Sequence, residues 1–440
     1  MKRKPIVAIV GRPNVGKSTL FNMLAGQRIS IVKDTPGVTR DRIYADATWL
    51  DKNFTIIDTG GIEPKTDNKL LKYMREQAEN AIELSDCVLF LTDVRDGVTD
   101  ADMEVAQMLR KANKRVILVV NKVDNIDKFQ ADVYEFYNLG LGDPYPISAL
   151  SKLNIGDMLE ELVKLFDYNV EEVEDERPRI AIIGKPNAGK SSLINKLLGE
   201  ERLIVSDIAG TTRDAVDTSL KRNGKEYVFI DTAGLRRKSK IKEDIERFSI
   251  LRAVSAVERC DVCILVIDAT EGVTEQDAKI AGIAHERGRG MIIAVNKWDA
   301  IEKDTKTVKK FSQEIRDVLS FLPYAEIMFI SAKTGQRVEK LFESIDLVIE
   351  NHSLRISTGV LNDILTEAVA LQQPPTDKGR RLKIFYITQI KVKPPTFIIF
   401  VNSKKIMHYS YTRYLENRIR DAFGFNGTPL KFIIRERKED

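Results

Sequence analysis

Residues 9–18 read Ile-Val-Gly-Arg-Pro-Asn-Val-Gly-Lys-Ser, and residues 182–191 read Ile-Ile-Gly-Lys-Pro-Asn-Ala-Gly-Lys-Ser. Both fit G-x-x-x-x-G-K-[ST], a glycine-rich loop that joins a strand to a helix. In such a loop backbone N–H groups converge and the helix N-terminus adds its positive dipole end, which suits polyphosphate. The sequence therefore predicts two phosphate-binding loops, 173 residues apart.

Four further motifs recur in the same order after each loop. They are T-R-D at 39–41 and 212–214, D-T-[GA]-G at 58–61 and 231–234, N-K-x-D at 121–124 and 296–299, and S-A at 148–149 and 331–332. The offset grows from 173 to 183 residues through loop-sized insertions alone. This pattern indicates a duplicated domain and not a short-period solenoid.

Apolar residues within each copy alternate between helix-like and strand-like patterns. In the first copy, residues 88–91 and 116–120 are continuous apolar runs, as in strands covered on both faces. Before them, one helical face is formed by Leu70, Leu71, Met74, Ala78, Ala81 and Ile82. The alternation predicts α/β domains, each a mostly parallel sheet with helices on both faces.

The length of 440 residues suits three domains. The acidic stretch 171–176, which ends shortly before Pro178, has the character of a solvated linker. We predict a first P-loop domain at 1–165, a linker at 166–178, a second P-loop domain at 179–351 and a small α+β domain at 352–440.

Composition limits the classes of protein. No apolar run approaches the roughly 18 residues of a membrane helix, so we expect no transmembrane span. Three cysteines make no disulfide framework, which favours a reducing compartment and a cytoplasmic location. Cys260 and Cys263 have C-x-x-C spacing, but no second Cys or His pair accompanies them, so a buried strand is the favoured interpretation.

Charge is distributed unevenly along the chain. The net charge is +4, yet residues 352–440 contain 16 Lys and Arg against 8 Asp and Glu. A basic C-terminal domain on a slightly acidic body predicts an anionic partner for that domain.

The loop and switch motifs assign roles around a triphosphate and Mg²⁺. Lys17 and Lys190 should reach the β- and γ-phosphates, while Ser18 and Ser191 ligate Mg²⁺. Asp58 and Asp231 follow apolar strands and would orient Mg²⁺ through water, and Gly61 and Gly234 can present an N–H to the γ-phosphate. Thr39 and Thr212 can ligate Mg²⁺ only while that phosphate is present, so hydrolysis would release their segments.

The base is predicted to be guanine. Asp124 or Asp299 can accept hydrogen bonds from N1–H and the exocyclic amine of guanine, whereas adenine presents an acceptor at N1. A site built to accept a hydrogen bond from its ligand can discriminate roughly 10⁴-fold against an analogue that lacks the donor. Asn121 and Asn296 would hold the loop, and the S-A motifs would supply an N–H to guanine O6. N-K-x-D is a weak pattern alone, but its place 105 and 107 residues after the P-loop lysines makes it strong.

These assignments together define two GTP sites. The first is predicted to comprise Gly11, Arg12, Pro13, Asn14, Val15, Gly16, Lys17, Ser18, Asp58, Thr59, Gly60, Gly61, Ile62, Asn121, Lys122, Val123, Asp124, Ser148 and Ala149. The second is predicted to comprise Gly184, Lys185, Pro186, Asn187, Ala188, Gly189, Lys190, Ser191, Asp231, Thr232, Ala233, Gly234, Leu235, Asn296, Lys297, Trp298, Asp299, Ser331 and Ala332.

One expected residue is missing after each D-T-[GA]-G motif. Many GTPases place a water-positioning glutamine there, and this chain has Ile62 and Leu235. An apolar side chain cannot orient water. Another group must therefore supply electrostatic stabilisation approaching that of an arginine finger, which is worth roughly 10³–10⁵ in rate.

The paired P-loops, the D-T-[GA]-G motifs and the basic C-terminal domain together resemble the bacterial Der (EngA) family of ribosome-assembly GTPases, over essentially the whole chain. The resemblance implies GTP hydrolysis, binding of the large ribosomal subunit and its rRNA, and a KH-like C-terminal fold packed against a G domain. It also implies K⁺ beside the phosphates, held by Asn14 and Asn187 and by carbonyls before Thr39 and Thr212. The predicted catalytic residues are Asn14, Lys17, Thr39, Asn187, Lys190 and Thr212. The alternative role for the two asparagines is to stabilise the loop turn. We expect a monomer.

The C-terminal domain is expected to contain helices at 359–371 and 411–423 and strands at 382–390, 396–401 and 430–435. A working KH module clamps RNA with a G-x-x-G loop between two helices. The candidate at 424–427 instead precedes the last strand, so the clamping role is not transferred to it. Candidate phosphate contacts in this domain are Arg380, Arg381, Lys383, Lys391 and Lys393.

Other functions stay open at this stage. The basic run at 236–242 could touch RNA or could be a solvated loop. The chain could also be an RNA-binding scaffold whose nucleotides are structural, although both copies keep their Lys, Ser, Thr and Asp. A tRNA-modification GTPase would need a further chemical motif, and none is found in the sequence.

Overall fold

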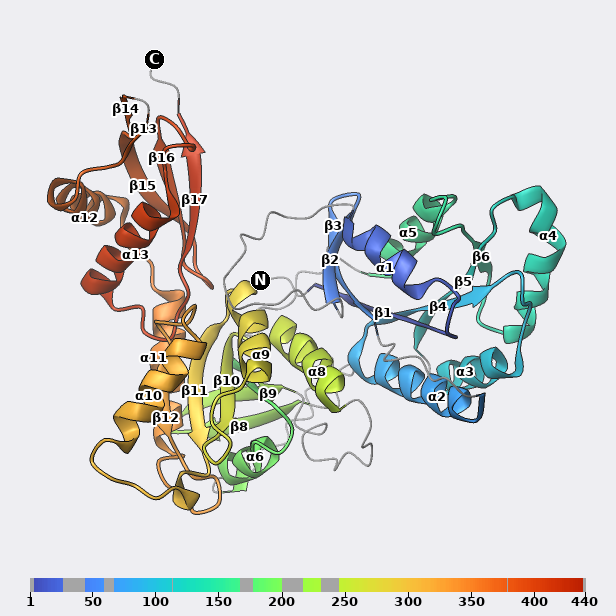
Figure 1. The fold of residues 1–440 in the computed structure, drawn as a ribbon, viewed down its shortest axis with the longest axis horizontal. Coiled ribbons are helices and arrows are strands. Elements are labelled where there is room, and N and C mark those ends of the chain that lie inside the picture. The colour runs from blue at the N-terminus through green and yellow to red at the C-terminus, as the bar shows by residue number, and fades with distance from the viewer. Residues whose placement is uncertain are drawn as a thin grey trace.

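The computed structural model describes residues 4–26, 44–58, 67–112, 114–166, 177–199, 217–230, 245–377 and 379–437, with side chains of 67–73 and 245–248 left out. Two α/β units and a smaller α+β unit follow one another along the chain (Figure 1). This confirms the predicted fold class. The predicted domain boundaries stay predictions, because residues 167–176 of the predicted linker at 166–178 lie outside the described residues.

The first unit is a six-stranded sheet in the order β2-β3-β1-β4-β5-β6. Its strands are β1 (Ile6–Gly11), β2 (Tyr44–Trp49), β3 (Lys52–Asp58), β4 (Cys87–Asp93), β5 (Arg115–Asn121) and β6 (Pro144–Pro146). Its helices are α1 (Lys17–Gly26), α2 (Asp67–Leu84), α3 (Asp100–Lys111), α4 (Ile126–Glu135), η1 (Phe136–Leu139) and α5 (Ile155–Lys164). Among the described strands of this first sheet, only the β2–β3 pair is antiparallel. Buried residues of α1 and α5 cover one face and those of α2 and α3 the other, as the apolar runs predicted.

The second unit repeats this topology in the order β12-β11-β10-β7-β9-β8. Its strands are β7 (Arg179–Ile183), β8 (Thr218–Arg222), β9 (Lys225–Ile230), β10 (Val262–Asp268), β11 (Gly290–Asn296) and β12 (Glu326–Phe329). Its helices are α6 (Lys190–Gly199), α8 (Ile245–Arg259), α9 (Glu275–Glu286), η2 (Trp298–Ala300), α10 (Thr307–Val318) and α11 (Lys340–Ser353). Cys263 is buried in β10 and Cys260 is buried just before it, both as free thiols, as predicted.

The third unit places helices on one face of a small sheet. It consists of α12 (Thr358–Leu371), β13 (Thr376–Asp377), β14 (Arg380–Arg381), β15 (Ile384–Lys391), β16 (Thr396–Val401), α13 (Tyr409–Phe423) and β17 (Lys431–Glu436). The strand expected from residue 382 begins at Ile384, because Leu382 N–H donates to the Pro375 carbonyl and not to β16. The helix expected from residue 411 begins at Tyr409, after an extended N-cap at His408.

The third unit is joined to the second through the loop that holds the G-x-x-G sequence. Met291 N–H donates to the Gly427 carbonyl at 2.7 Å, and Gly427 N–H donates to the Tyr324 carbonyl at 2.8 Å. A Cβ on Gly427 would lie 2.1 Å from the Val348 side chain. Phe425 in the same loop is buried. This loop is therefore an interdomain contact, which agrees with withholding the RNA-clamping role from it.

The two α/β units also touch each other. Helices α2 and α8 pack together, and Arg252 Nη2 lies 2.7 Å from Glu83 Oε1. Farther along the contact, Arg287 donates to Asp46 at 2.8 Å and pairs with Glu258 at 2.6 Å. None of the described helices has the length and the apolar composition of a membrane-spanning segment.

Candidate nucleotide-binding sites

Each phosphate-binding loop requires glycine at its second conserved position. Gly16 has φ +98°, and a Cβ there would lie 2.3 Å from Asn121 Nδ2. Gly189 has φ +93°, and its Cβ would lie 2.2 Å from Asn296 Nδ2. Any side chain would be strained by the backbone and would also collide with a buried amide. The loop is therefore held close against the N-K-x-D motif of the same copy.

One buried asparagine per copy ties three loops together. Asn121 Nδ2 donates to the Val15 carbonyl at 2.7 Å, and Asn121 Oδ1 accepts from Ala149 N–H at 2.9 Å. Asn296 makes the same two bonds, to the Ala188 carbonyl and from Ala332 N–H, each at 2.9 Å. The phosphate loop, the N-K-x-D turn and the S-A turn thus have a fixed mutual position in both copies.

The carboxylates predicted to recognise the base are oriented by the S-A serines. Ser148 Oγ donates to Asp124 Oδ1 at 2.7 Å, and Ser331 Oγ donates to Asp299 Oδ1 at 2.6 Å. The serine hydroxyl lowers the pKa of each aspartate, and the Arg95 guanidinium adds to the lowering at Asp124. Both groups are therefore carboxylates at neutral pH, ready to accept hydrogen bonds.

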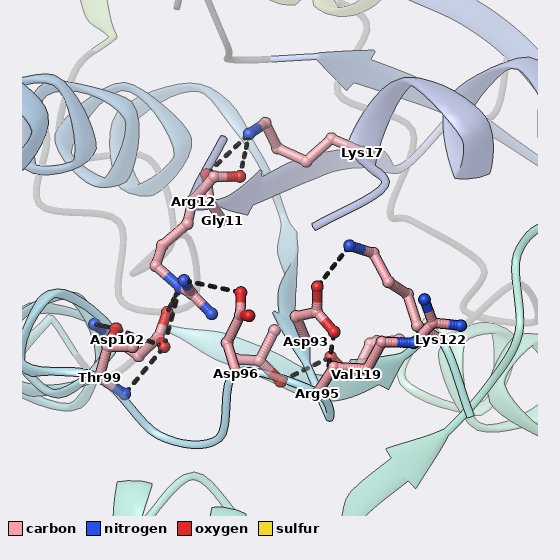
Figure 2. Close-up of polar contacts among 11 residues, drawn as sticks. Gly11, Arg12, Lys17, Asp93, Arg95, Asp96, Thr99, Asp102, Val119 and Lys122 are labelled. Atoms are coloured by element: carbon pink, nitrogen blue, oxygen red, sulfur yellow. Dashed lines mark hydrogen bonds and ion pairs between the residues drawn. The ribbon is translucent and has the colours of Figure 1, made fainter. Parts of the chain in front are cut away.

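The P-loop lysines reach across their own loops, as Figure 2 shows for Lys17. Lys17 Nζ donates to the carbonyls of Gly11 at 2.9 Å and Arg12 at 2.5 Å. Lys190 Nζ makes the matching bonds to Gly184 at 2.7 Å and Lys185 at 2.5 Å. Burial lowers the pKa of Lys190 to about 8, with Asp277 opposing that shift. Each ammonium therefore lies at the loop where phosphate charge is expected.

A sixth repeated motif is not among those predicted above. Residues 93–102 and 268–277 share the pattern D-x-x-x-G-V-T-x-x-D at an offset of 175, which could have been found by the same self-comparison. Its first aspartate pairs with the N-K-x-D lysine: Asp93 with Lys122, and Asp268 with Lys297 at 2.5 Å. Both lysines have a left-handed backbone, with φ +66° and +61°, so this pair steadies a strained turn.

The last aspartate of this pattern, which lies in α3, braces the phosphate loop in the first copy. Asp102 is fully buried and accepts from Arg12 Nε at 3.2 Å while closing a capping box with Thr99 (Figure 2). Burial raises the pKa of Asp102, and Arg12 is the main opposing influence. In the second copy Asp277 closes the same box with Thr274, and Lys185 lies 2.6 Å from Glu271.

The remaining predicted residues divide into two groups. Asn14 and Asn187 are exposed and left-handed, with φ +64° and +63°, a conformation in which asparagine stabilises a turn. Ser18 and Ser191 lie in the first turns of α1 and α6, and Asp58 ends β3. The other group lies outside the described residues: Thr39, Thr59, Gly60, Gly61, Ile62, Thr212, Asp231, Thr232, Ala233, Gly234, Leu235 and the basic run at 236–242.

Comparison with known proteins agrees with this architecture. Residues 6–122 and 179–297 match the family described as 50S ribosome-binding GTPase, and residues 355–435 match the KH-domain-like C-terminal family of EngA bacterial GTPase enzymes. The GTPase Der of Agathobacter rectalis is 72% identical over 438 residues, covering 99% of both chains. This chain belongs to the Der family of GTPases. The Der proteins of Lachnoclostridium phytofermentans and Clostridium novyi are 73% and 60% identical, each over 99% of this chain.

Membership in the Der family makes the protein a GTP-binding switch that hydrolyses GTP. Solved structures with similar folds include an Era variant of Aquifex aeolicus bound to GDP and aluminium fluoride, with 23% identity, a TM-score of 0.30, and coverage of 59% of this chain and 94% of that one. The FeoB G-domain of Methanococcus jannaschii has 23% identity and a TM-score of 0.28, and covers 37% of this chain and 97% of that one. At these scores the structures add nothing to the Der assignment.

Proposed function

We propose that both α/β units bind guanine nucleotides through the residues predicted above, and that the protein is a double GTPase of large-subunit ribosome assembly. The observation that carries the proposal is the repeated amide tie. In each copy one buried asparagine joins the phosphate loop to the turn that carries the base-reading carboxylate. The distance between phosphate and base contacts is thereby set before any ligand arrives, which favours binding.

Hydrolysis would depend on charge placed around the phosphates. When nucleotide binds, the ammonium groups of Lys17 and Lys190 would donate to phosphate oxygens in place of the loop carbonyls. Mg²⁺ suits the donor set, because Ser18 and Ser191 offer hydroxyls and Asp58 a carboxylate, all hard oxygen ligands. When bound, Mg²⁺ neutralises charge that develops on the β- and γ-phosphate oxygens.

K⁺ is proposed as the substitute for the missing glutamine and arginine finger. The side chains of Asn14 and Asn187 are exposed, and within the described ranges neither amide makes a hydrogen bond, so both amide oxygens suit a hard cation. Their left-handed backbone also supports the turn-stabilising role, and the two roles are compatible. Thr39 and Thr212 complete the proposed catalytic set with Lys17 and Lys190.

The third unit is the proposed contact with rRNA. Arg380, Arg381, Lys383 and Lys391 are exposed near one another in sequence and can reach phosphates. The domain carries twice as many basic as acidic residues. Its family match is the KH-domain-like C-terminal domain of EngA GTPases, while the two α/β units match the family described as 50S ribosome-binding GTPase. We propose a cytoplasmic monomer that carries this domain to the large subunit.

Co-sedimentation of the purified protein with ribosomal subunits tests the proposal. We expect pelleting with the large subunit to differ between a non-hydrolysable GTP analogue and GDP, because the switch segments respond to the γ-phosphate. Equal pelleting in both nucleotide states would favour the alternative, an RNA-binding scaffold with structural nucleotides. No association with the large subunit would contradict the ribosomal role.

A further inference from the structure

The two candidate guanine pockets share the asparagine tie and the serine–carboxylate bond, but they differ at one position beside the base-reading carboxylate. Residue 95 follows β4 by two positions, and residue 270 follows β10 by two positions, at the offset of 175 that relates these strands. The first copy has Arg95 there and the second has Thr270. Because one chain carries both pockets, the second pocket can be compared directly with the first.

Arg95 turns toward the N-K-x-D loop. Its N–H donates to Asp93 Oδ1 at 3.0 Å, which fixes the backbone after β4. Its guanidinium Nη2 then donates to Asp124 Oδ2 at 2.7 Å. Because Ser148 already donates to Asp124 Oδ1, both oxygens of this carboxylate have a donor within the protein.

Thr270 turns away from the corresponding carboxylate. Its N–H and hydroxyl both donate to Asp268 Oδ1, at 2.9 and 2.7 Å. Asp299 accepts from Ser331 at Oδ1, and among the residues that the structure describes no side chain forms an ion pair with Asp299. The second oxygen of Asp299 therefore meets no guanidinium.

We propose that Arg95 competes with guanine for Asp124 and so makes the first pocket the weaker of the two. This inference rests on the proposed role of Asp124 in accepting hydrogen bonds from guanine N1–H and its amine. Those two donors need the carboxylate edge that Arg95 occupies, so binding must break or bend the ion pair. In the second pocket guanine would not have to break an ion pair with an arginine.

The ion pair is exposed, which bounds the size of the effect. Arg95 and Asp124 side chains are 56% and 40% exposed. Exposed pairs contribute roughly 0.2–1 kcal/mol, so removing the competitor should tighten binding by about 1.4- to fivefold. The effect should shrink at high ionic strength, where exposed pairs are screened.

Reciprocal substitution tests the inference. Binding of fluorescent GDP is measured in the full chain at low salt. Asp299→Ala removes binding in the second pocket so that the first is measured alone, and Asp124→Ala does the reverse. Arg95→Thr should lower the Kd of the first pocket by about 1.4- to fivefold, and Thr270→Arg should raise the Kd of the second pocket by a similar factor. Arg75→Thr is the matched control, because Arg75 is also 56% exposed and ion-paired in the same unit, to Glu104.

The outcomes separate this inference from the proposed function. If Arg95→Thr leaves the Kd unchanged or raises it, Arg95 does not compete with the base and the inference is wrong. A raised Kd would instead mean that Arg95 helps to hold the nucleotide. If Asp124→Ala and Asp299→Ala do not each abolish one site, the carboxylates do not read guanine and the proposed function itself fails.

Discussion

Single side chains at the centre of each pocket have little freedom. The amide of Asn121 is buried and satisfied on both sides, so it fixes the loops it joins. Gly16 faces that amide at a distance that leaves no space for a methyl group. Removing a buried partner costs about 1–3 kcal/mol for each group left unsatisfied, so small changes here should have large effects on binding.

Gly16→Ala should abolish nucleotide binding in the first pocket. The added Cβ would lie 2.3 Å from Asn121 Nδ2 and would be held at φ +98°, so the loop and the amide must separate. Gly26→Ala is the control, because a Cβ at the end of α1 meets nothing within 4 Å. Isothermal titration with GDP measures both variants. Wild-type affinity in Gly16→Ala would contradict the described loop geometry.

Hydrolysis should respond to the choice of monovalent cation. With Ile62 and Leu235 in place of glutamine and Asn14 and Asn187 offering amide oxygens, we expect faster phosphate release in KCl than in NaCl at equal ionic strength. Asn14→Ala with Asn187→Ala should remove that difference while GDP affinity is followed as a control for loop integrity. Equal turnover of the wild-type protein in the two salts would exclude a role for K⁺.

At the scale of elements, much of the fold follows from the sequence and some does not. Strand β16 has the predicted bounds, 396–401, and the duplicated motifs predict two sheets of one topology. The capping boxes of α3 and α9 are local patterns, and comparing the two copies over 93–102 and 268–277 could have found them. The ion pairs of Asp93 and Asp102 were missed because they join segments distant in sequence, which periodicity does not register.

Two histidines near the ends of α9 and α11 should make stability depend on pH. Burial lowers the pKa of His285 to about 4 and that of His352 to about 3, against 6.5 for the free side chain. Above pH 6.5 both histidines are neutral in the folded and in the unfolded chain, so they do not lower the free energy of unfolding. As pH falls below 6.5 the unfolded chain binds protons that the folded chain does not, so the free energy of unfolding falls.

Urea denaturation between pH 7 and pH 4.5 measures this dependence. We expect His352→Leu to flatten the curve, because it removes the group whose pKa is lowered most. The exposed His408→Gln is the control and should leave the slope as in the wild-type protein. An unchanged slope in His352→Leu would contradict its buried, neutral state.

At the scale of the molecule, the units meet through contacts that no single unit's sequence predicts. Helices α2 and α8 each follow a D-T-[GA]-G motif, and they pack against one another (Figure 1). An ion pair of this contact joins Arg252 of α8 to Glu83 at the C-terminal end of α2, the end of that helix far from the motif. The G-x-x-G loop is a similar case: its buried glycine serves docking, which only the assembled structure reveals.

Arg287 should control docking between the two α/β units. It pairs with Asp46 of the first unit and with Glu258, a carboxylate that is only 4% exposed. Arg287→Ala would leave Glu258 buried without its cation, at a cost of about 3–5 kcal/mol. We expect a larger radius of gyration by small-angle X-ray scattering. Arg418→Ala, in an exposed pair within the third unit, is the control, and equal radii for both variants would contradict the described contact.

Two guanine pockets in one chain are the claim on which the whole account depends. Equilibrium titration of the nucleotide-free protein with GDP, with ATP as competitor, measures it most directly. We predict two GDP bound per chain, one in each of Asp124→Ala and Asp299→Ala, and no displacement by ATP at equal concentration. Fewer than two sites in the wild-type protein, or equal binding of ATP, would contradict the account.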